Sequence, residues 1–322
     1  MSGLPTIGLK LKYVGALFAA VLLLSFLTPL AALNESLLSY LGIVWWAILL
    51  GLTFGGLIDY FVPDGFIVHF LGQRRKRSLV YAVFSGFLMS ACSHGILAIA
   101  MQLYKKGASV PAVITFLLAS PWANLPVTIL LFGFFGWQAA LIVIGAMLIA
   151  LLTGLIYMGL DNLGLIEGSL PSVKSNDRSW QRLREFKAAD ATRGVVAGAI
   201  RLANMVLWWL LIGILAAALI GAYVPAHWFM QFLGADFSGM LLTLLFATII
   251  EVCSEGSSPI AFEIFDNTGA LGNAFIFLMA GVATDYTEIG LLWSTIGKRT
   301  ALWLPIVTVP QILLLAYVLT NL

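Results

Sequence analysis

Apolar runs of about twenty residues or more recur along the whole chain, and this feature limits the possible folds more than any other. A chain in lipid must satisfy its own backbone hydrogen bonds, and over runs of this length helices do so. Of the 322 residues, 61% are hydrophobic and 10% are charged, whereas a soluble domain has about 25% charged residues. We therefore expect an all-α integral membrane protein. The runs lie at about 14–33, 41–62, 79–104, 110–135, 138–160, 197–223, 239–265, 270–296 and 301–319.

The third and seventh runs are interrupted at their centres by small and polar residues. The interruptions read Ala-Cys-Ser-His-Gly at 91–95 and Glu-Val-Cys-Ser-Glu-Gly-Ser-Ser-Pro at 251–259. Nine full crossings would place the basic loops 74–77 and 161–196 on opposite sides, whereas two re-entrant hairpins place every Lys and Arg in the cytoplasm. The positive-inside tendency favours the hairpins. We expect about seven full spans and two hairpins in the cytoplasmic (inner) membrane, with the N-terminus inside and the C-terminus outside.

The two halves of the chain match each other at a separation of 161 to 163 residues. The matching segments include Val44-Trp45-Trp46 with Leu207-Trp208-Trp209, and Cys92-Ser93-His94-Gly95 with Cys253-Ser254-Glu255-Gly256. The segment after Gly72 is basic and its counterpart after Gly234 is not, which predicts repeats of inverted topology. A duplication kept only for folding would also explain the symmetry. The predicted organisation is an extra span at 1–40, a first repeat at 41–160 with its hairpin at 79–107, a cytoplasmic loop at 161–196, and a second repeat at 197–322 with its hairpin at 239–268.

The interruptions concentrate the residues that we expect to bind a solute. A helix breaks at mid-depth in a membrane only beside protein or a water-filled cavity, and the half-helix that follows directs its N–H groups toward polar oxygens or anions. Ser93 and Ser254 suit the capping position of that half-helix, and capping alone is the alternative reading. Pro121 and Pro126 break the fourth run, either as a cavity wall or as a packing kink. The predicted substrate-binding residues are Cys92, Ser93, His94, Gly95, Cys253, Ser254, Glu255, Gly256, Ser120, Asn124 and Asp285.

Acidic residues within the apolar runs are concentrated in the second half of the chain. A carboxylate at mid-depth costs about 2.5–3.5 kcal/mol, so each requires a partner, a proton or water. Glu255, Asp285 and Glu251 are the predicted proton-coupling residues. The alternative is that these acids are neutral and hydrogen-bonded, and only hold the helices together. Glu263, near the end of its run, is expected to be structural.

The chain has two cysteines, Cys92 and Cys253, one in each interruption. Two thiolates could hold a trivalent metalloid, or they could exchange with a disulfide in a membrane-embedded electron carrier. No G-x-x-x-x-G-K-[ST] motif is present, so we expect no direct coupling to ATP within this chain. Two cysteines are too few for a Cys-rich zinc or iron–sulfur site. We expect a permease and not an enzyme, with no cofactor and no metal site. The net charge of +2 does not argue for nucleic acid. The expected partners are a small solute or ion, the lipid bilayer, and a second copy of the chain if it oligomerises. An alternative function is that of a membrane scaffold that transports nothing.

Three motifs resemble the ArsP-type predicted permease family over nearly the whole chain. They are Cys-Ser-x-Gly in both interruptions, Tyr104-Lys-Lys-Gly-Ala-Ser109 and Phe116-Leu-Leu-Ala-Ser-Pro121. The resemblance implies a permease, and members of the family include efflux permeases for trivalent organoarsenicals. His94 and Glu255 stand where the family commonly has a second cysteine, and Ala98 stands where Pro259 lies in the other half. We expect a secondary-active exporter of a small solute, either an arsenical or another metalloid, or an anion.

Overall fold

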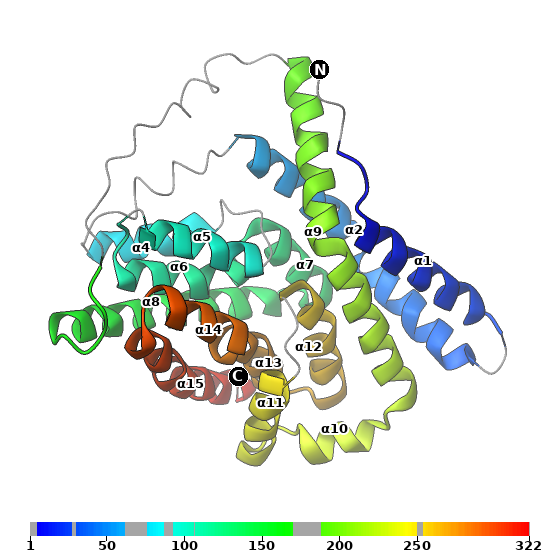
Figure 1. The fold of residues 1–322 in the computed structure, drawn as a ribbon. Helices are drawn as coiled ribbons and strands as arrows, with labels where there is room; N and C mark the ends of the chain where they lie inside the picture. Colours follow the sequence, from blue (N-terminus) through cyan, green and yellow to red (C-terminus); the bar gives the residue numbers. More distant parts are fainter. Residues whose placement is uncertain are drawn as a thin grey trace.

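The structure is a computed structural model that describes residues 5–27, 30–61, 76–86, 93–105, 107–169, 188–249 and 254–321. All regular elements in these ranges are helices, in agreement with the expected all-α class (Figure 1). In chain order they are α1 (Leu9–Leu24), α2 (Ala31–Phe61), α4 (Lys76–Ser85), α5 (Ser93–Lys105), α6 (Val110–Ala123), α7 (Leu125–Phe135), α8 (Gln138–Asn162), α9 (Ala188–Tyr223), α10 (Ala226–Phe232), α11 (Phe237–Ile249), α12 (Ser254–Thr268), α13 (Leu271–Thr284), α14 (Tyr286–Thr295) and α15 (Lys298–Thr320). The predicted boundary at residue 40 falls inside α2.

Several of these helices have the length and composition of membrane spans. Within the described ranges, α8, the α13–α14 stretch and α15 are long and apolar enough to cross a bilayer. The α6–α7 pair makes a fourth if its 47° bend is counted within one span. The 13 residues of α11 rise only about 20 Å, less than the roughly 30 Å of hydrocarbon. The protein is therefore helical and multi-pass, while the number of seven spans and the two hairpins stay predictions.

The centre of the bundle is formed by α6 and α13. Every residue of α6 is buried, and α13 is buried except at Gly281 and Thr284. α6 packs on α4, α5 and α8, and α13 packs in the same way on α11, α12 and α15. Glycines allow the backbones to approach closely: a Cβ added at Gly272 would lie 2.1 Å from the carbonyl oxygen of Ala316 on α15.

The repeat in the sequence is also a repeat of helices and breaks. α6 begins at Val110 and α13 at Leu271, which are 161 residues apart. The breaks at Asn124 and Asp285 are separated by the same 161 residues. Glycines with positive φ precede equivalent helices: Gly107 and Gly269 before α6 and α13, and Gly136 and Gly297 before α8 and α15. Among the described residues, α5 to α8 and α12 to α15 thus follow in the same order, and the inversion between the halves stays a prediction.

The end of α8 is tied to the start of α15. The Glu167 carboxylate accepts hydrogen bonds from the backbone N–H groups of Arg299 (3.0 Å) and Thr300 (2.8 Å) and from the Thr300 hydroxyl (2.8 Å). The Ser169 hydroxyl, two residues later, accepts from the backbone N–H of Val110 at the start of α6. Segments that sequence analysis placed at the cytoplasmic face therefore lie together at one end of the bundle.

α2 and α9 are 31 and 36 residues long and pack against each other. Their crossing is close, because a Cβ added at Gly56 would lie 2.4 Å from the carbonyl oxygen of Val195. α1 packs on α9, so α1, α2 and α9 lie together beside the remaining helices (Figure 1). The largest contacts of the pair with the rest of the bundle are α2 on α7 and α9 on α12. These contacts enclose the candidate site.

Candidate functional site

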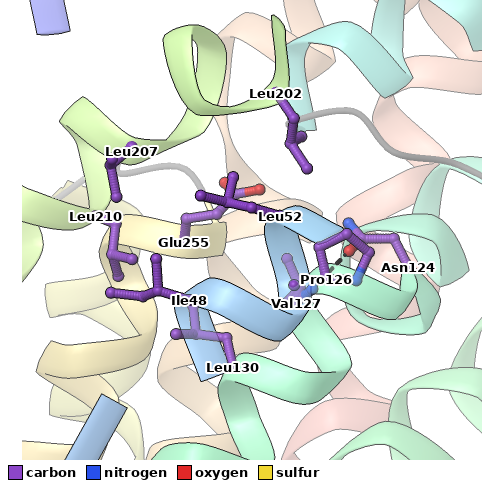
Figure 2. Close-up of a pocket in the computed structure, with 11 residues that line it drawn as sticks. Ile48, Leu52, Asn124, Pro126, Val127, Leu130, Leu202, Leu207, Leu210 and Glu255 are labelled. Atoms are coloured by element: carbon purple, nitrogen blue, oxygen red, sulfur yellow. Dashed lines mark hydrogen bonds between the residues drawn. The ribbon is translucent and has the colours of Figure 1, made fainter. Parts of the chain in front are cut away.

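A pocket with an empty volume of about 460 Å³ lies between α2, α7, α9 and α12. Two of its lining side chains are polar: Asn124, from the α6–α7 break, and Glu255, from the first turn of α12 (Figure 2). The other lining residues are aliphatic or glycine, namely Ile48, Gly51, Leu52, Pro126, Val127, Leu130, Leu202, Leu207 and Leu210. Interruptions from both halves of the chain therefore meet at one pocket.

Asn124 is positioned by the two prolines that flank it. Pro121 lies inside α6 near its end, and Pro126 is the second residue of α7, where a missing N–H is tolerated. The Asn124 backbone is extended, and its side-chain oxygen accepts from the backbone N–H of Val127 at 2.8 Å. This cap starts α7 and holds Asn124 at the pocket with only 2% of its surface exposed.

Glu255 is the second residue of α12 and is 2% exposed. The first turn of a helix carries the positive end of the helix dipole, which stabilises a carboxylate there. The structure differs from the expectation for Ser254, because Ser254 is the first helical residue and its hydroxyl donates to Glu255 Oε2 at 3.2 Å. The Ser254 hydroxyl thus orients the pocket carboxylate.

Gly256 forms the contact between α12 and α9. A Cβ added at Gly213 on α9 would lie 2.4 Å from the Gly256 carbonyl oxygen, so the two backbones touch. This contact brings Leu210 of α9 and Glu255 of α12 to the same pocket. The geometry therefore gives Gly256, predicted to bind substrate, a part in packing the wall.

Asp285 occupies the position in the second half that Asn124 occupies in the first. It breaks the chain between α13 and α14, is 8% exposed, and accepts from the backbone N–H of Glu288 at 3.3 Å. Asn124 and Asp285 therefore occupy equivalent positions, and the side chain of each accepts a hydrogen bond from the backbone N–H three residues later, at the start of α7 or α14. Asp285 is not among the residues that line the pocket with Glu255. The structure brings together Asn124 and Glu255 but not Asp285.

Ser120 lies on α6 and does not line the pocket, although it was predicted to bind substrate. Its hydroxyl is fully buried and has no hydrogen-bond partner in the described part of the chain. The indole N–H of Trp122, two residues later, is in the same situation. Each buried unsatisfied group costs about 1–3 kcal/mol, which water or a solute would relieve. Sequence analysis did not single out Trp122, although it lies between Pro121 and Asn124.

Several predicted site residues cannot be placed. Cys92, Cys253 and Glu251 lie outside the described residues. Ser93, His94 and Gly95 are described only as the helical start of α5. Among the described residues, no group of three His, Cys, Asp or Glu side chains is arranged to hold a metal ion. The roles proposed for the two thiols and for His94 therefore stay predictions.

The apolar walls of the pocket were missed by sequence analysis. They come from α2, α7 and α9, as Ile48, Leu52, Leu130, Leu202, Leu207 and Leu210. In a membrane protein a leucine that faces a cavity and one that faces lipid look the same in sequence. The one available signal was the repeated motif at 44–46 and 207–209, since Leu207 belongs to it.

Glu263 lies two turns beyond Glu255 on α12 and joins that helix to α2. Its carboxylate accepts hydrogen bonds from the Tyr40 hydroxyl and from Asn267 Nδ2. It borders a second cavity of about 680 Å³, whose other lining side chains include Trp228, Phe229 and Phe246. These contacts fit the structural role expected for Glu263.

Comparison with known proteins gives one family match. The family model ArsP_1, described as "Predicted permease", matches residues 29–321. The UPF0718 protein YcgR of Bacillus subtilis is 26% identical over 257 residues, which cover 78% of this chain and 84% of that protein. A Streptococcus mutans protein, provisionally named a two-component membrane permease complex subunit, is 23% identical over 248 residues, which cover 76% of this chain and 80% of that protein. No solved structure matches.

Proposed function

Because this chain belongs to the ArsP_1 family of predicted permeases, we propose that it is a secondary-active permease whose solute passes through the pocket between α2, α7, α9 and α12. The observation that carries the proposal is the meeting of Asn124 and Glu255, both buried side chains, at a pocket with aliphatic walls. Helix breaks of this kind at a repeat interface are where secondary transporters bind their solutes. The chain acts as an exporter in the cytoplasmic membrane.

Re-entrant hairpins in an inverted repeat are part of the proposal. α10 packs on both α11 and α12, which supports a hairpin whose two ends lie at the same face. The two helices of the proposed hairpin are short: α11 has 13 residues and α12 has 15. The contacts of Glu167 with Arg299 and Thr300 support a common side for the 161–169 segment and the start of α15. The proposed topology keeps the basic segments in the cytoplasm, the N-terminus inside and the C-terminus outside.

Glu255 is proposed as the group that couples solute movement to protons. Its burial and its place on the pocket let it bind either a proton or the solute as the pocket opens to one side and then to the other. Asp285 and Glu251 are proposed as further coupling groups. The site would also take in the Cys92 and Cys253 thiols, and Ser120 and Trp122 support it because their buried donors have no partner among the described residues.

The resemblance leaves a trivalent organoarsenical, another metalloid or an anion as the first candidate solutes. Thermal unfolding of the purified protein in the presence of each tests the proposal, because a bound ligand stabilises by RT ln(1 + [L]/Kd). Leu52→Trp fills the pocket from α2. Leu50→Trp, on the same helix but 43% exposed, is the matched control. A ligand of the pocket raises the Tm of wild type and Leu50→Trp but not of Leu52→Trp; equal stabilisation of all three would place the solute elsewhere.

A further inference from the structure

The second cavity, which lies between the end of α9 and helices α10, α11 and α12, has no part in the proposed function. It holds about 680 Å³ of empty space, and its described lining residues include none of those that line the pocket with Glu255. Nine of its ten lining residues are aliphatic or aromatic, namely Ile220, Val224, Trp228, Phe229, Phe232, Leu233, Phe246, Ile260 and Ile264. Such walls gain dispersion contacts from an apolar occupant.

The tenth lining residue, Glu263, has both carboxylate oxygens engaged within the protein. Oε2 accepts a hydrogen bond from the Tyr40 hydroxyl, and Oε1 accepts one from Asn267 Nδ2 at 2.8 Å. A Cβ added at Gly221 on α9 would lie 2.6 Å from Oε1, so the carboxylate lies against the α9 backbone. Because a buried water needs two or more polar partners, this cavity offers little to water. It requires no charged or hydrogen-bonding group from its occupant.

The second cavity has a buried floor and an exposed rim. Ile260 and Ile264 of α12 form the floor and are buried, whereas Trp228 and Phe232 of α10 form the rim and are exposed. Exposed aliphatic side chains continue the surface beside the rim, namely Leu219 of α9 and Leu241, Leu242 and Leu245 of α11. In a multi-pass membrane protein an exposed surface of this composition faces lipid. The cavity is therefore continuous with the lipid-facing surface.

α10 has the composition of a helix at the membrane–water interface. Its exposed side chains include the aromatic Trp228 and Phe232 as well as the polar His227 and Gln231. The Trp228 and Phe232 rings pack edge to face, with 6.4 Å between their centroids. Tryptophan is enriched where hydrocarbon meets water, because its ring is apolar and its N–H is polar. A long apolar chain that enters beside these rings would therefore keep a polar end at the interface.

We propose that the second cavity binds one acyl chain of a membrane lipid, which enters beside Trp228 and Phe232 and ends against Ile260 and Ile264. The chain of the lipid is recognised and the charge of its headgroup is not, because no Lys or Arg occurs from residue 202 to residue 297. The site does not depend on the permease activity, since the lining residues belong to a different cavity.

Photolabelling of the full-length protein in phosphatidylcholine vesicles tests the site. The probe is a phosphatidylcholine with a diazirine at the end of one acyl chain, and mass spectrometry of peptides locates the label. Label is expected on Ile260 or Ile264, which are buried and lie beside lipid only if a chain enters the cavity. Leu245 is exposed on α11 and should be labelled by the surrounding bilayer. Label on Leu245 with none on Ile260 or Ile264 would overturn the proposal.

Two neighbouring residues of α9 give a matched pair of variants. Ile220 lines the cavity, whereas Leu219 is exposed and is not among the lining residues. Ile220→Trp fills the cavity, so the label on α12 should be lost while the label on Leu245 stays. Leu219→Trp should be labelled like the wild-type protein. The label on Leu245 and an unchanged Tm show that Ile220→Trp is folded, and α12 labelling that persists in this variant would contradict the proposed site.

Two further measurements separate a lipid chain from other occupants. A phosphatidylglycerol probe with the same diazirine chain should label α12 as strongly as the phosphatidylcholine probe, because the chain and not the headgroup is bound. Labelling of α12 by the phosphatidylglycerol probe alone would overturn this recognition of the chain. Loss of the α12 label when a transported solute is added would assign the cavity to that solute, and so would overturn the lipid site while leaving the permease in place.

Discussion

At the scale of single residues, the pocket depends on where two carboxylates of one helix are placed. Glu255 and Glu263 are both buried on α12, 2% and 7% exposed. Glu263 is held by Tyr40 and Asn267, whereas Glu255 faces the pocket. Sequence analysis distinguished them because Glu255 lies within the polar interruption and Glu263 beyond it. Position in a run does not reveal which cavity an acid faces, because that depends on the helices packed against α12.

Glu255→Gln should abolish pH-driven accumulation of the solute in membrane vesicles, whereas exchange driven by the solute gradient should be weakened but still measurable. Glutamine keeps the shape of the side chain and removes its titration. Asp285→Asn tests the second proposed coupling group in the same assay, and Glu263→Gln is the control. Full pH-driven accumulation in both Glu255→Gln and Asp285→Asn would assign these acids to structure and place coupling elsewhere.

Glu167 predicts a pH dependence of stability outside the membrane. Partial burial raises its pKa, but hydrogen bonds from Thr300 and Arg299 outweigh this effect, and the pKa lies below its usual value of 4.5. A carboxylate with a lowered folded pKa stabilises above its unfolded pKa, and the contribution is lost as pH falls through the folded value. The Tm of the wild-type protein should therefore decrease as the pH is lowered past about 4.5. Glu167→Gln should be less stable at neutral pH, by about 1 kcal/mol for a lost cap, and should lack that part of the acid-dependent loss. A Glu167→Gln protein with the wild-type pH profile would contradict the role of the cap.

At the scale of helices, the breaks were easier to predict than their partners. The prolines at 121 and 126 located the α6–α7 break, and the repeat placed its counterpart at Asp285. The pairing of Asn124 with Glu255 could not be derived in the same way. Two repeats of similar sequence predict equal surroundings for Asn124 and Asp285, whereas in the structure Asn124 lines the pocket with residues of α2 and α9 and Asp285 does not.

Gly213→Ala should destabilise the protein by about 1–3 kcal/mol, because the added methyl meets the Gly256 backbone and forces α9 from α12. Gly159→Ala on α8 is the control, since a Cβ there meets nothing within 4 Å. Alanine favours a helix over glycine, so the control should be unchanged or slightly stabilised. Thermal unfolding in detergent measures both, and equal Tm values for the two variants would contradict the close contact.

At the scale of the whole molecule, composition predicted the helical membrane class, and the motifs of the chain predicted the permease family. Helices in lipid expose apolar side chains on all sides, as Leu314 and Tyr317 of α15 do, 70% and 61% exposed. Apolar runs therefore predict that helices exist but not which faces meet. The close packing of α2 on α9, and of each on the other helices, involves glycine contacts that become visible only in three dimensions.

Labelling of single cysteines in intact cells tests the proposed orientation. In a background without native cysteines, cysteines at Lys105 and Arg299 should react with a membrane-impermeant maleimide only after the cells are opened. A cysteine at Asp236, which is fully exposed in the α10–α11 turn, should react from outside. Labelling of Lys105→Cys in intact cells would exclude the hairpin topology, because it would place the end of α5 outside.

The Glu167 cap also has a consequence for the order of synthesis. Glu167 leaves the ribosome more than a hundred residues before the amides of Arg299 and Thr300 that it binds, since 132 and 133 positions separate them. The chain is made from the N-terminus, so α8 and its loop are in place before α15 exists. The last helix, α15, thus packs against a segment around Glu167 that was synthesised before it. A nascent chain that stops before Lys298 leaves the Glu167 carboxylate without these hydrogen-bond donors.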